Sequence, residues 1–416
     1  MGKRRAQLAF VRDFLVERGG VAFHGHVLRD PLCLTNLEPG RVDPYPIYRR
    51  IRARGRFIRS SLGPYATATH EVCHRLLRDR RFGAASDDPR LGAPDLSFLT
   101  MNPPDHDRLR RFALPTFSPR AVAGFAPFVR ATTDRLLDRV SPGEPFDLVS
   151  TLAAPLPIAV ITELLGVPDA NAEEFADYGA TFGSALGGLQ SLRHARELMR
   201  AQDQLTALFT ELLEVKRRDP GSDVLSRLAA ADPDTVRPEE AAPMCILLLI
   251  AGFETTVNLI GNTMLALLER PHIWRRVCED PRRAEAAVEE TLRFDAPVQR
   301  TARFVLEEAT VEGHTLSVGE VVVLMIGGAN RDPAVFERPD EFDLDRTGHD
   351  HLAFAGGIHY CVGAALARLE ATIAVQELAT RFPSLRKAGS LDRRPGSLIR
   401  GLRHFEVQSS RTPVSV

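Results

Sequence analysis

The most informative stretch of this sequence is Phe354-Ala-Gly-Gly-Ile-His-Tyr-Cys-Val-Gly-Ala-Ala-Leu-Ala-Arg-Leu-Glu370. It predicts a glycine-rich loop that enters a helix, because Leu366, Leu369 and Ile373 recur at helical spacing. Cys361 lies at that entry, where backbone N–H groups and the helix dipole favour negative charge. Both effects lower the pKa of a thiol, so the stretch favours a thiolate at Cys361.

The glycines of this stretch indicate what such a thiolate faces. Gly357 and Gly363 have no Cβ, so a flat, bulky group can approach the backbone closely. A thiolate presented to a flat group suits axial ligation of haem iron. Two alternatives are a small buried cysteine and a phosphate-binding loop. The second is disfavoured because no strand precedes the glycines and no lysine follows them.

The overall charge excludes few functions but disfavours one. The 416 residues include 53 Lys and Arg against 54 Asp and Glu, a formal net charge of −1. A dedicated nucleic-acid binder usually carries a basic excess, so that class is disfavoured. Of the basic residues, 50 are arginines, a bias that we attribute to a GC-rich bacterial genome.

The sequence further predicts a soluble, cytoplasmic protein without a membrane span. Its five cysteines form no CxxC pair, which disfavours both a disulfide framework and a zinc site. Arg12 and Asp13 interrupt the apolar run that a signal peptide needs. The most apolar stretch, Met244–Phe253, ends at Glu254 and is far shorter than the roughly 20 residues that cross a bilayer.

Helical spacing of apolar residues dominates the chain, so the predicted fold class is mainly α with a small β region. We expect an N-terminal leader over residues 1–20 and a single domain over 21–416, because no linker divides the rest. The predicted helices lie at 46–51, 121–140, 147–165, 195–217, 239–270 and after Cys361, with strands within 57–69 and 310–324, a long loop at 84–104 and a polar meander at 329–352.

The pattern Phe-x-x-Gly-x-His-x-Cys-x-Gly followed by Leu-Ala-Arg resembles the haem-binding signature of the cytochrome P450 family. The resemblance implies the cytochrome P450 fold, with a long central helix over the haem, and haem b ligated through its iron by Cys361. Three further family motifs occur in family order, so it covers nearly the whole chain. One position departs from the family: Ala355 replaces the usual glycine, and we expect Gly356 and Gly357 to absorb the turn.

The first of these motifs is Ala251-Gly-Phe-Glu-Thr-Thr256, inside the long predicted helix. One alternative is that Thr255 bonds the carbonyl four residues back while Glu254 points to solvent. The resemblance instead implies that Gly252 lets the helix open beside the iron. By the same resemblance, Thr255 holds the dioxygen and Glu254 relays protons.

The second motif is Glu290-Thr-Leu-Arg293. Its two charges are one helical turn apart, so a surface ion pair is the alternative. The resemblance implies that Glu290 and Arg293 join Arg346 in a buried network that supports the cysteine loop. That role is structural and not catalytic.

The third motif concerns the two carboxylates of the haem. His106 and Arg110 are four residues apart and share one face of a predicted helix. The resemblance implies that they bind the propionates together with Arg303 and His359. Buried carboxylates need such charge-assisted donors. The alternative for each arginine is an ordinary solvated surface position.

The resemblance implies a monooxygenase that inserts one atom of O2 into a medium to large, mostly apolar organic substrate, by hydroxylation or epoxidation. A ferredoxin and its reductase would supply electrons, docking at a basic face that includes Arg108, Arg111 and Arg368. Secondary-metabolite tailoring is the expected context. The segments expected to contact the substrate are 84–100, 175–195 with Phe175, Phe182, Leu186 and Leu189 as an apolar lid, the helix around Leu248–Ala251, Pro297–Thr301 and Leu398–Ile399.

Three other activities use the same haem. Two are enzymatic: oxidative C–C or C–O coupling, and peroxide-driven oxidation. The third is a non-enzymatic haem-thiolate sensor. The sensor does not need the acid–alcohol pair Glu254-Thr255, whose presence favours catalysis.

Overall fold

The computed structural model describes residues 16, 18–38, 40–86, 96–168, 178, 181–182, 191–348, 350–394 and 396–410. The expected leader falls mostly outside these residues, although 18–26 are helical. The expected lid also falls mostly outside them: Phe182 is buried, whereas Phe175, Leu186 and Leu189 are not described. The division into a leader and one domain stays a prediction.

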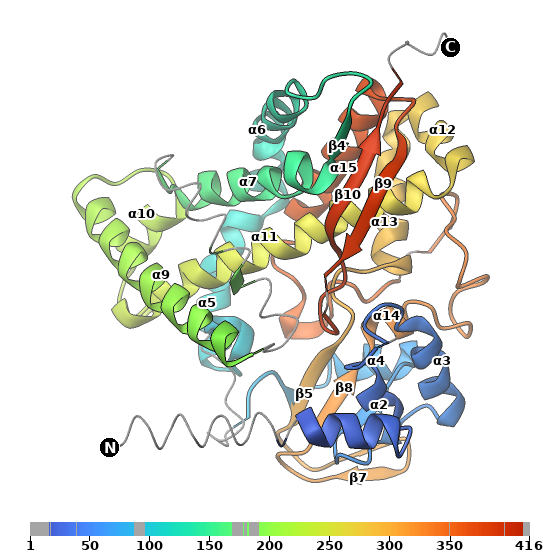
Figure 1. Ribbon diagram of the computed structural model, residues 1–416. Coiled ribbons are helices and arrows are strands. Elements are labelled where there is room, and N and C mark those ends of the chain that lie inside the picture. The colour runs from blue at the N-terminus through green and yellow to red at the C-terminus, as the bar shows by residue number, and fades with distance from the viewer. Residues whose placement is uncertain are drawn as a thin grey trace.

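One long helix, α11 (Pro238–Leu268), runs through the middle of the molecule, and the other helices pack around it (Figure 1). It begins with Pro238 at its first position, where a missing N–H costs nothing. Most of its side chains are buried on all sides, so it is a core helix rather than an amphipathic one. The helices in contact with it include α7 (Pro155–Leu165), α9 (Leu192–Arg218), α12 (Pro271–Glu279), α13 (Ala284–Phe294) and α15 (Ala364–Arg381).

By length and composition α11 is able to cross a membrane, because its apolar part is longer than the stretch counted in the sequence. The apolar stretch predicted from the sequence ended at Glu254, but the apolar pattern resumes after that residue. However, 83% of the most apolar window of α11 is buried inside the protein, as in the core helix of a soluble protein. Length and hydropathy therefore give only weak evidence for a membrane span.

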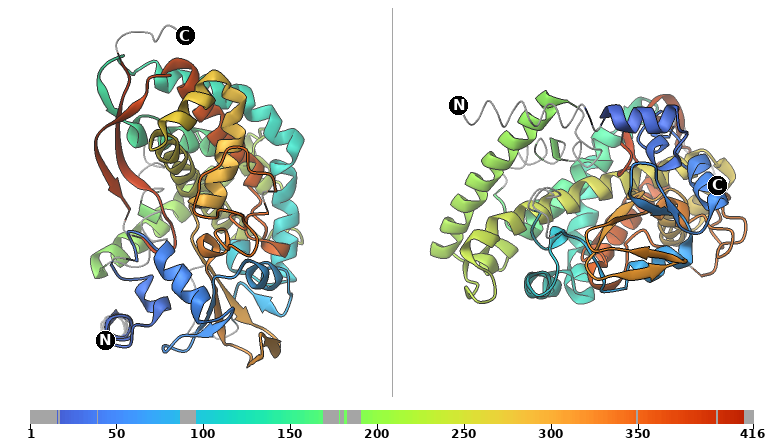
Figure 2. Two further views of the ribbon diagram at one scale, coloured as in Figure 1. Left: turned by 90° about the vertical axis from the view of Figure 1, so that its right-hand side faces the viewer. Right: turned by 90° about the horizontal axis from the view of Figure 1, so that it is seen from below.

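The remaining helices are short or peripheral (Figures 1 and 2). They are α2 (Pro31–Leu34), α3 (Tyr45–Arg54), α4 (His70–Leu76), α5 (Asp105–Ala113), α6 (Pro119–Leu137), α10 (Val224–Ala229) and α14 (Ile326–Ala329), with the short helical turns η2 (Ser97–Thr100), η3 (Leu114–Phe117), η4 (Val149–Ala153), η6 (Pro281–Arg283) and η7 (Gly357–His359).

The strands form three small sheets at the edge of the helical body (Figure 1). The largest has the order β1-β2-β8-β5-β3, and β2 and β8 pair in parallel. A second has the order β4-β10-β9 and carries the C-terminal hairpin. The strands are β1 (Ile58–Arg59), β2 (Tyr65–Thr67), β3 (Phe82–Gly83), β4 (Pro145–Asp147), β5 (Thr301–Val305), β6 (Ala309–Val311), β7 (His314–Leu316), β8 (Val321–Leu324), β9 (Arg386–Arg393) and β10 (Leu402–Gln408).

These elements confirm the predicted fold class and most predicted helices. The strand pair within 57–69 is β1 and β2, and the β region within 310–324 is β6, β7 and β8. The loop predicted at 84–104 contains the turn η2, and residues 87–95 of it lie outside the described residues. The sequence analysis did not predict β9 and β10. Strand β9 has no alternation because it is almost wholly exposed, whereas β10, the central strand of its sheet, alternates over the buried Phe405 and Val407.

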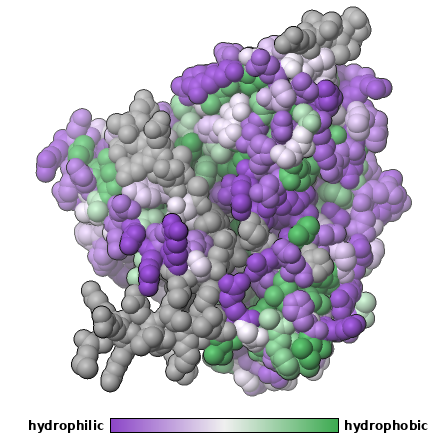
Figure 3. All heavy atoms as spheres, in the orientation of Figure 1, coloured by the Kyte–Doolittle hydropathy of each residue, from purple (hydrophilic) through white to green (hydrophobic). Residues whose placement is uncertain are grey.

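Among the coloured residues of Figure 3, hydrophilic ones predominate, with smaller groups of hydrophobic residues between them. This agrees with a balanced charge and a core that accounts for most apolar side chains.

Candidate active site

The loop before α15 holds Cys361 in a fixed position. The Cys361 N–H donates to the Phe354 carbonyl at 3.0 Å, and Gly363 is the N-cap of α15. The thiol has open surface, yet desolvation is the largest influence on its pKa. The open surface of Cys361 therefore faces an interior space.

The expectation that the helix start makes Cys361 a thiolate is wrong for the polypeptide alone. Burial raises the pKa of the thiol, and this outweighs the opposing effects of the Gly363 N–H, Arg110 and Arg368. A bound metal cation would reverse that balance, because a coordinating thiol is deprotonated. The donor is consequently suited to a metal and is not a free reactive thiolate.

Ala355 itself adopts a turn conformation, contrary to the expectation that only Gly356 and Gly357 absorb the turn. Its φ is +59°, in the left-handed region, and Gly357 has a φ of +65°. Gly356, at a φ of −171°, is extended. The two glycines absorb only part of the turn, and Ala355 adopts a conformation that costs an L-residue about 1 kcal/mol.

The part of α11 between Ala251 and Thr255 also faces an interior space. Ala251 is exposed and Thr255 is half-exposed, although this helix crosses the centre of the molecule. The Thr255 hydroxyl donates to the Ala251 carbonyl at 2.8 Å, so the alternative given for Thr255 is confirmed. The helix is continuous there, and Gly252 lets Ile161 of α7 pack closely, because an added Cβ would lie 3.0 Å from Ile161 Cδ1.

Glu254, by contrast, does not point to solvent. Its side chain is fully buried, and its Oε1 is 3.2 Å from Arg394 Nη1 and 3.1 Å from Asn258 Nδ2. Its other oxygen, Oε2, is buried without a hydrogen-bond partner. Burial raises the pKa of Glu254, while Arg394 and Asn258 lower it. This carboxyl is therefore suited to holding and releasing a proton.

A cluster of basic side chains lies beside the cysteine loop. The rings of His106 and His359 are 4.3 Å apart between centroids, and the Nε2 atom of each is buried without a partner. The Arg303 guanidinium is buried, and within the described residues it donates only to Thr301 Oγ1 and the Ala302 carbonyl. The cluster therefore contains donors without matching acceptors.

The pKa values of this cluster reflect its unbalanced charge. Burial, together with the charges of Arg303, His106 and Arg110, lowers the pKa of His359 to about 3. Burial alone lowers the pKa of Arg303 to about 10. Arg110 donates to the Tyr360 carbonyl on the cysteine loop, so it lies at the same place. Two carboxylates would supply the missing acceptors, and the propionates of haem b fit this donor set.

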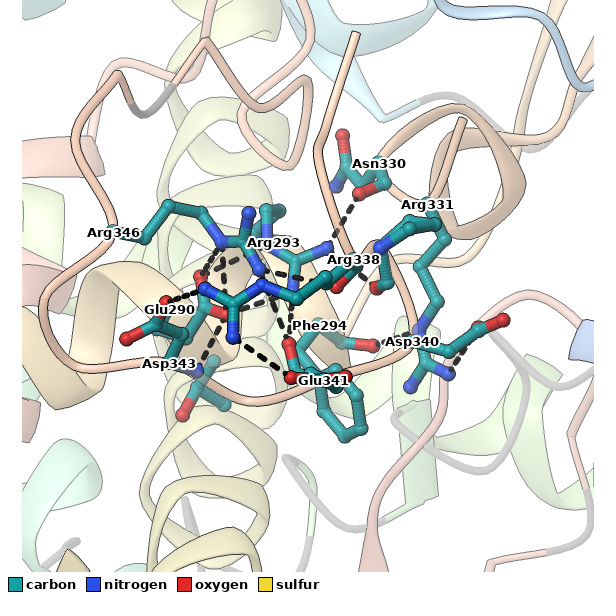
Figure 4. A network of polar contacts seen from close by, with 12 residues as sticks. Glu290, Arg293, Phe294, Asn330, Arg331, Arg338, Asp340, Glu341, Asp343 and Arg346 are labelled. Atoms are coloured by element: carbon teal, nitrogen blue, oxygen red, sulfur yellow. Dashed lines mark hydrogen bonds and ion pairs between the residues drawn. The ribbon is translucent and has the colours of Figure 1, made fainter. Parts of the chain in front are cut away.

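Glu290, Arg293 and Arg346 meet in a buried network, as the resemblance implied (Figure 4). Arg293 and Glu290 are both fully buried and are joined by two hydrogen bonds, of 2.9 and 2.7 Å. Arg293 also donates to the carbonyls of Asn330, Pro339 and Glu341. The network thus fixes the polar meander before the cysteine loop, and the alternative of a surface ion pair is wrong.

Of the three arginines expected to dock a ferredoxin, two are already paired. Arg108 contacts Glu240 and Asp105, each at 2.6 Å, and Arg368 pairs with Glu289. Arg111 is exposed. A groove of about 1080 Å³ lies on the outer side of the cysteine loop and was not predicted from the sequence. It is lined by Phe354, Ala355 and Tyr360 of that loop and by Arg49, Arg52, Arg56, Arg78 and Arg368.

Arg394 is the other contributor that the sequence analysis missed. It lies at the end of the C-terminal hairpin, 140 residues from Glu254, and no local pattern links the two. The same hairpin region brings two expected substrate segments together, because Val298 and Ile399 form a β-bridge and the Gln299 N–H donates to the Leu398 carbonyl at 2.8 Å.

Comparisons with known proteins agree with this site. The family described as Cytochrome P450 matches residues 189–388. The "Biotin biosynthesis cytochrome P450" of Bacillus subtilis is 38% identical over 83% of this chain and 91% of its own. The "Nocardicin C N-oxygenase" of Nocardia uniformis is 39% identical over 87% of this chain and 95% of its own. The structure of P450BioI in complex with hexadec-9Z-enoic acid ligated acyl carrier protein has a TM-score of 0.85 and 36% identity, covering 89% and 99% of the two chains.

Proposed function

This chain belongs to the cytochrome P450 family of haem b oxidoreductases, and from that premise we propose a specific activity and a role for each site residue. The activity is insertion of one oxygen atom from O2 into a medium to large, mostly apolar organic substrate, by hydroxylation or epoxidation. Relatives named for biotin biosynthesis and for N-oxygenation of nocardicin C support a role in biosynthetic tailoring. The free thiols of all five cysteines favour the cytoplasm.

One observation carries the proposal: the accessible thiol of Cys361 lies at an interior space beside buried, unmatched basic donors. Cys361 Sγ is the iron ligand, and His106, Arg110, Arg303 and His359 hold the propionates. When bound, haem supplies the reduction of O2 and the transfer of one oxygen atom. The test is the spectrum of the reduced, CO-bound protein, which should show the thiolate-type Soret band. Replacing Cys361 by Ser should abolish that band, and its persistence would refute the assignment.

Glu254 and Thr255 are the proposed proton donors. Burial raises the pKa of Glu254 and so favours its protonated form, and Arg394, which is 22% exposed, connects it toward solvent. Thr255 Oγ1 is at the interior surface of α11 and can pass a proton onward when it releases the Ala251 carbonyl. Thr255→Ala should therefore uncouple partner-driven consumption of O2 from product formation. Unchanged coupling would favour peroxide-driven or coupling chemistry, which does not need this pair.

The groove on the outer side of the cysteine loop is the proposed docking surface for an acidic ferredoxin, which a reductase supplies with electrons. Five arginines line it. Three of them already pair with carboxylates, so among the described residues its unpaired positive charge comes from Arg52 and Arg78. Such a surface steers an acidic partner and makes association sensitive to salt.

Charge reversal tests the docking surface. Arg78 is exposed on this groove and Arg111 is exposed on α5, so Arg78→Glu and Arg111→Glu should each raise the KM for ferredoxin and reduce its salt dependence. Arg200→Glu, at an exposed position of α9, is the control and should change neither. If Arg78→Glu behaves like the control, this face is not the docking surface.

A further inference from the structure

Arg368 contacts the cysteine loop from its outer side. It lies on α15, seven residues after Cys361, and lines the same groove as Phe354 and Tyr360 of the loop. Its guanidinium carbon is 4.5 Å from the centroid of the Phe354 ring, within the range of a cation–π contact. The Phe354 carbonyl in turn accepts the Cys361 N–H at 3.0 Å. Arg368 therefore contacts the loop at the residue that holds the Cys361 backbone.

A carboxylate from a different helix pairs with Arg368. Glu289 of α13 accepts from Arg368 Nε through one oxygen and from Arg368 Nη2, at 3.1 Å, through the other. Two parallel bonds of this kind hold a guanidinium in one orientation. Burial by itself raises the pKa of Glu289, but the hydrogen bonds from His351 and Arg368 hold that pKa at about 2. Glu289 is therefore ionised at neutral pH, and the two opposite charges are fixed beside the loop.

His351 is the third member of this cluster, and its hydrogen bonds indicate a neutral ring. The side chain is only 3% exposed, and its Nε2 is 3.2 Å from Glu289 Oε2. Its Nδ1 accepts the Ala353 N–H at 3.3 Å, so the ring proton is on Nε2 and is donated to Glu289. The three side chains of His351, Glu289 and Arg368 therefore carry one negative and one positive charge.

The pair differs from an ordinary surface ion pair in burial and in position. The side chains of Arg368 and Glu289 are 32% and 18% exposed, so solvent and salt screen their charges only in part. The positive member is the one that contacts the Phe354 ring. Its charge also reaches the thiol: burial raises the pKa of Cys361, and Arg368 is one of the groups that oppose this effect. The two charges are thus placed to act on the group that Cys361 binds.

We propose that Arg368 and Glu289 are positioning residues that set the charge on the outer side of the cysteine loop, and thereby the reduction potential of the iron that Cys361 binds. This inference rests on the proposed ligation of iron by Cys361. A nearby positive charge favours the ferrous state, which carries one positive charge fewer than the ferric state, and a nearby negative charge favours the ferric state. Removing either member alone should therefore shift the potential in opposite directions, whereas a loosened loop would shift it the same way in both variants.

Spectroelectrochemical titration of the substrate-free holoenzyme, at neutral pH and fixed ionic strength and without ferredoxin, measures this potential. Arg368→Gln should make it more negative, so that the ratio of ferrous to ferric protein at the midpoint potential of the parent falls at least about 3-fold. Glu289→Gln should make it more positive and raise the same ratio. Arg368→Lys keeps the charge and should lie closer to the parent than Arg368→Gln does. Glu377→Gln, which breaks an ion pair with Arg130 further along α15, is the control and should leave the potential unchanged.

The proposal is overturned if both Gln variants shift the potential in the same direction, if neither shifts it, or if Arg368→Lys matches Arg368→Gln. Loss of the thiolate-type Soret band of the reduced, CO-bound protein in both Gln variants also overturns it, because the pair then maintains the shape of the loop. The same band in the parent separates the two proposals. A parent without the band refutes the ligation by Cys361, whereas a parent with the band and without opposite shifts in the variants refutes only the role of the charge pair.

Discussion

Arg293 and Arg303 are both almost completely buried, yet the hydrogen-bond acceptors around the two guanidiniums differ. Arg293 donates to both Glu290 carboxylate oxygens and to three backbone carbonyls. Among the described residues, Arg303 has two neutral acceptors and no carboxylate, and close to it lie His106 and His359, whose buried Nε2 atoms have no hydrogen-bond partner. A buried charge that the chain satisfies by itself is part of the scaffold. A buried charge that the chain leaves unmatched indicates a ligand from outside.

The largest expected effect comes from removing Glu290, the carboxylate that accepts the hydrogen bonds of Arg293. Glu290→Ala leaves Arg293 and Arg346 without their carboxylate, and breaking a buried pair in this way costs about 3–5 kcal/mol of folding free energy. Urea unfolding monitored by far-UV circular dichroism measures the loss. Glu341→Ala is the control. The Glu341 side chain pairs with the exposed Arg338, so this substitution should cost less than about 1 kcal/mol. Equal stability of the two variants would remove the basis for calling the network a scaffold.

Replacing the buried Arg303 should have the opposite effect on the stability of the apoprotein. Arg303→Gln should leave the apoprotein as stable as the parent or more so, because a buried, uncompensated charge is lost. The same change should weaken retention of haem by about 10-fold, through loss of a charge-assisted contact to a propionate. Transfer of haem to apomyoglobin measures retention, and Arg386→Gln on exposed β9 is the control. Destabilised apoprotein with normal haem retention would contradict the prediction.

Glu254 is intermediate between Arg293 and Arg303. Its Oε1 contacts Arg394 and Asn258, whereas its buried Oε2 has no hydrogen-bond partner. Arg394 lowers the pKa of Glu254, so Arg394→Gln should raise it. A proton donor works while it is protonated, and its activity falls as the pH rises through its pKa. The alkaline fall in coupled product formation should therefore shift to higher pH in Arg394→Gln. The pH profile of product formed per O2 consumed checks this, and an unshifted profile would exclude Arg394 as a positioning residue.

The smallest expected effect is that of a substitution at Ala355 in the cysteine loop. Ala355 has a φ of +59°, which glycine adopts without strain. Ala355→Gly should therefore stabilise the holoenzyme by about 0.5 kcal/mol, the relief of backbone strain being partly offset by the greater freedom of glycine in the unfolded chain. Thermal unfolding measures the change, and a loss of stability would show that the turn holds no strain at this position.

Much of this protein was predictable because the information was local. The cysteine loop, the Glu290–Arg293 spacing, the His106–Arg110 pair and the apolar course of α11 are each contained in a few residues, and helical periodicity converts such spacing into a shared face. Those motifs together were enough to predict the family, the haem and the fold class. The strand β9 was not predictable in the same way, because an exposed edge strand has no alternation of buried and exposed residues to detect.

Tertiary structure alone decided how the charges are matched. Arg394 reaches Glu254 across 140 residues, and Arg108 is paired with Glu240 instead of being available for a partner. The sequence determined which residues carry charge and which elements they belong to. It did not determine their neighbours, because the energy of a charge depends on burial and on partners brought together only by folding, and both vary with distance in space rather than along the chain.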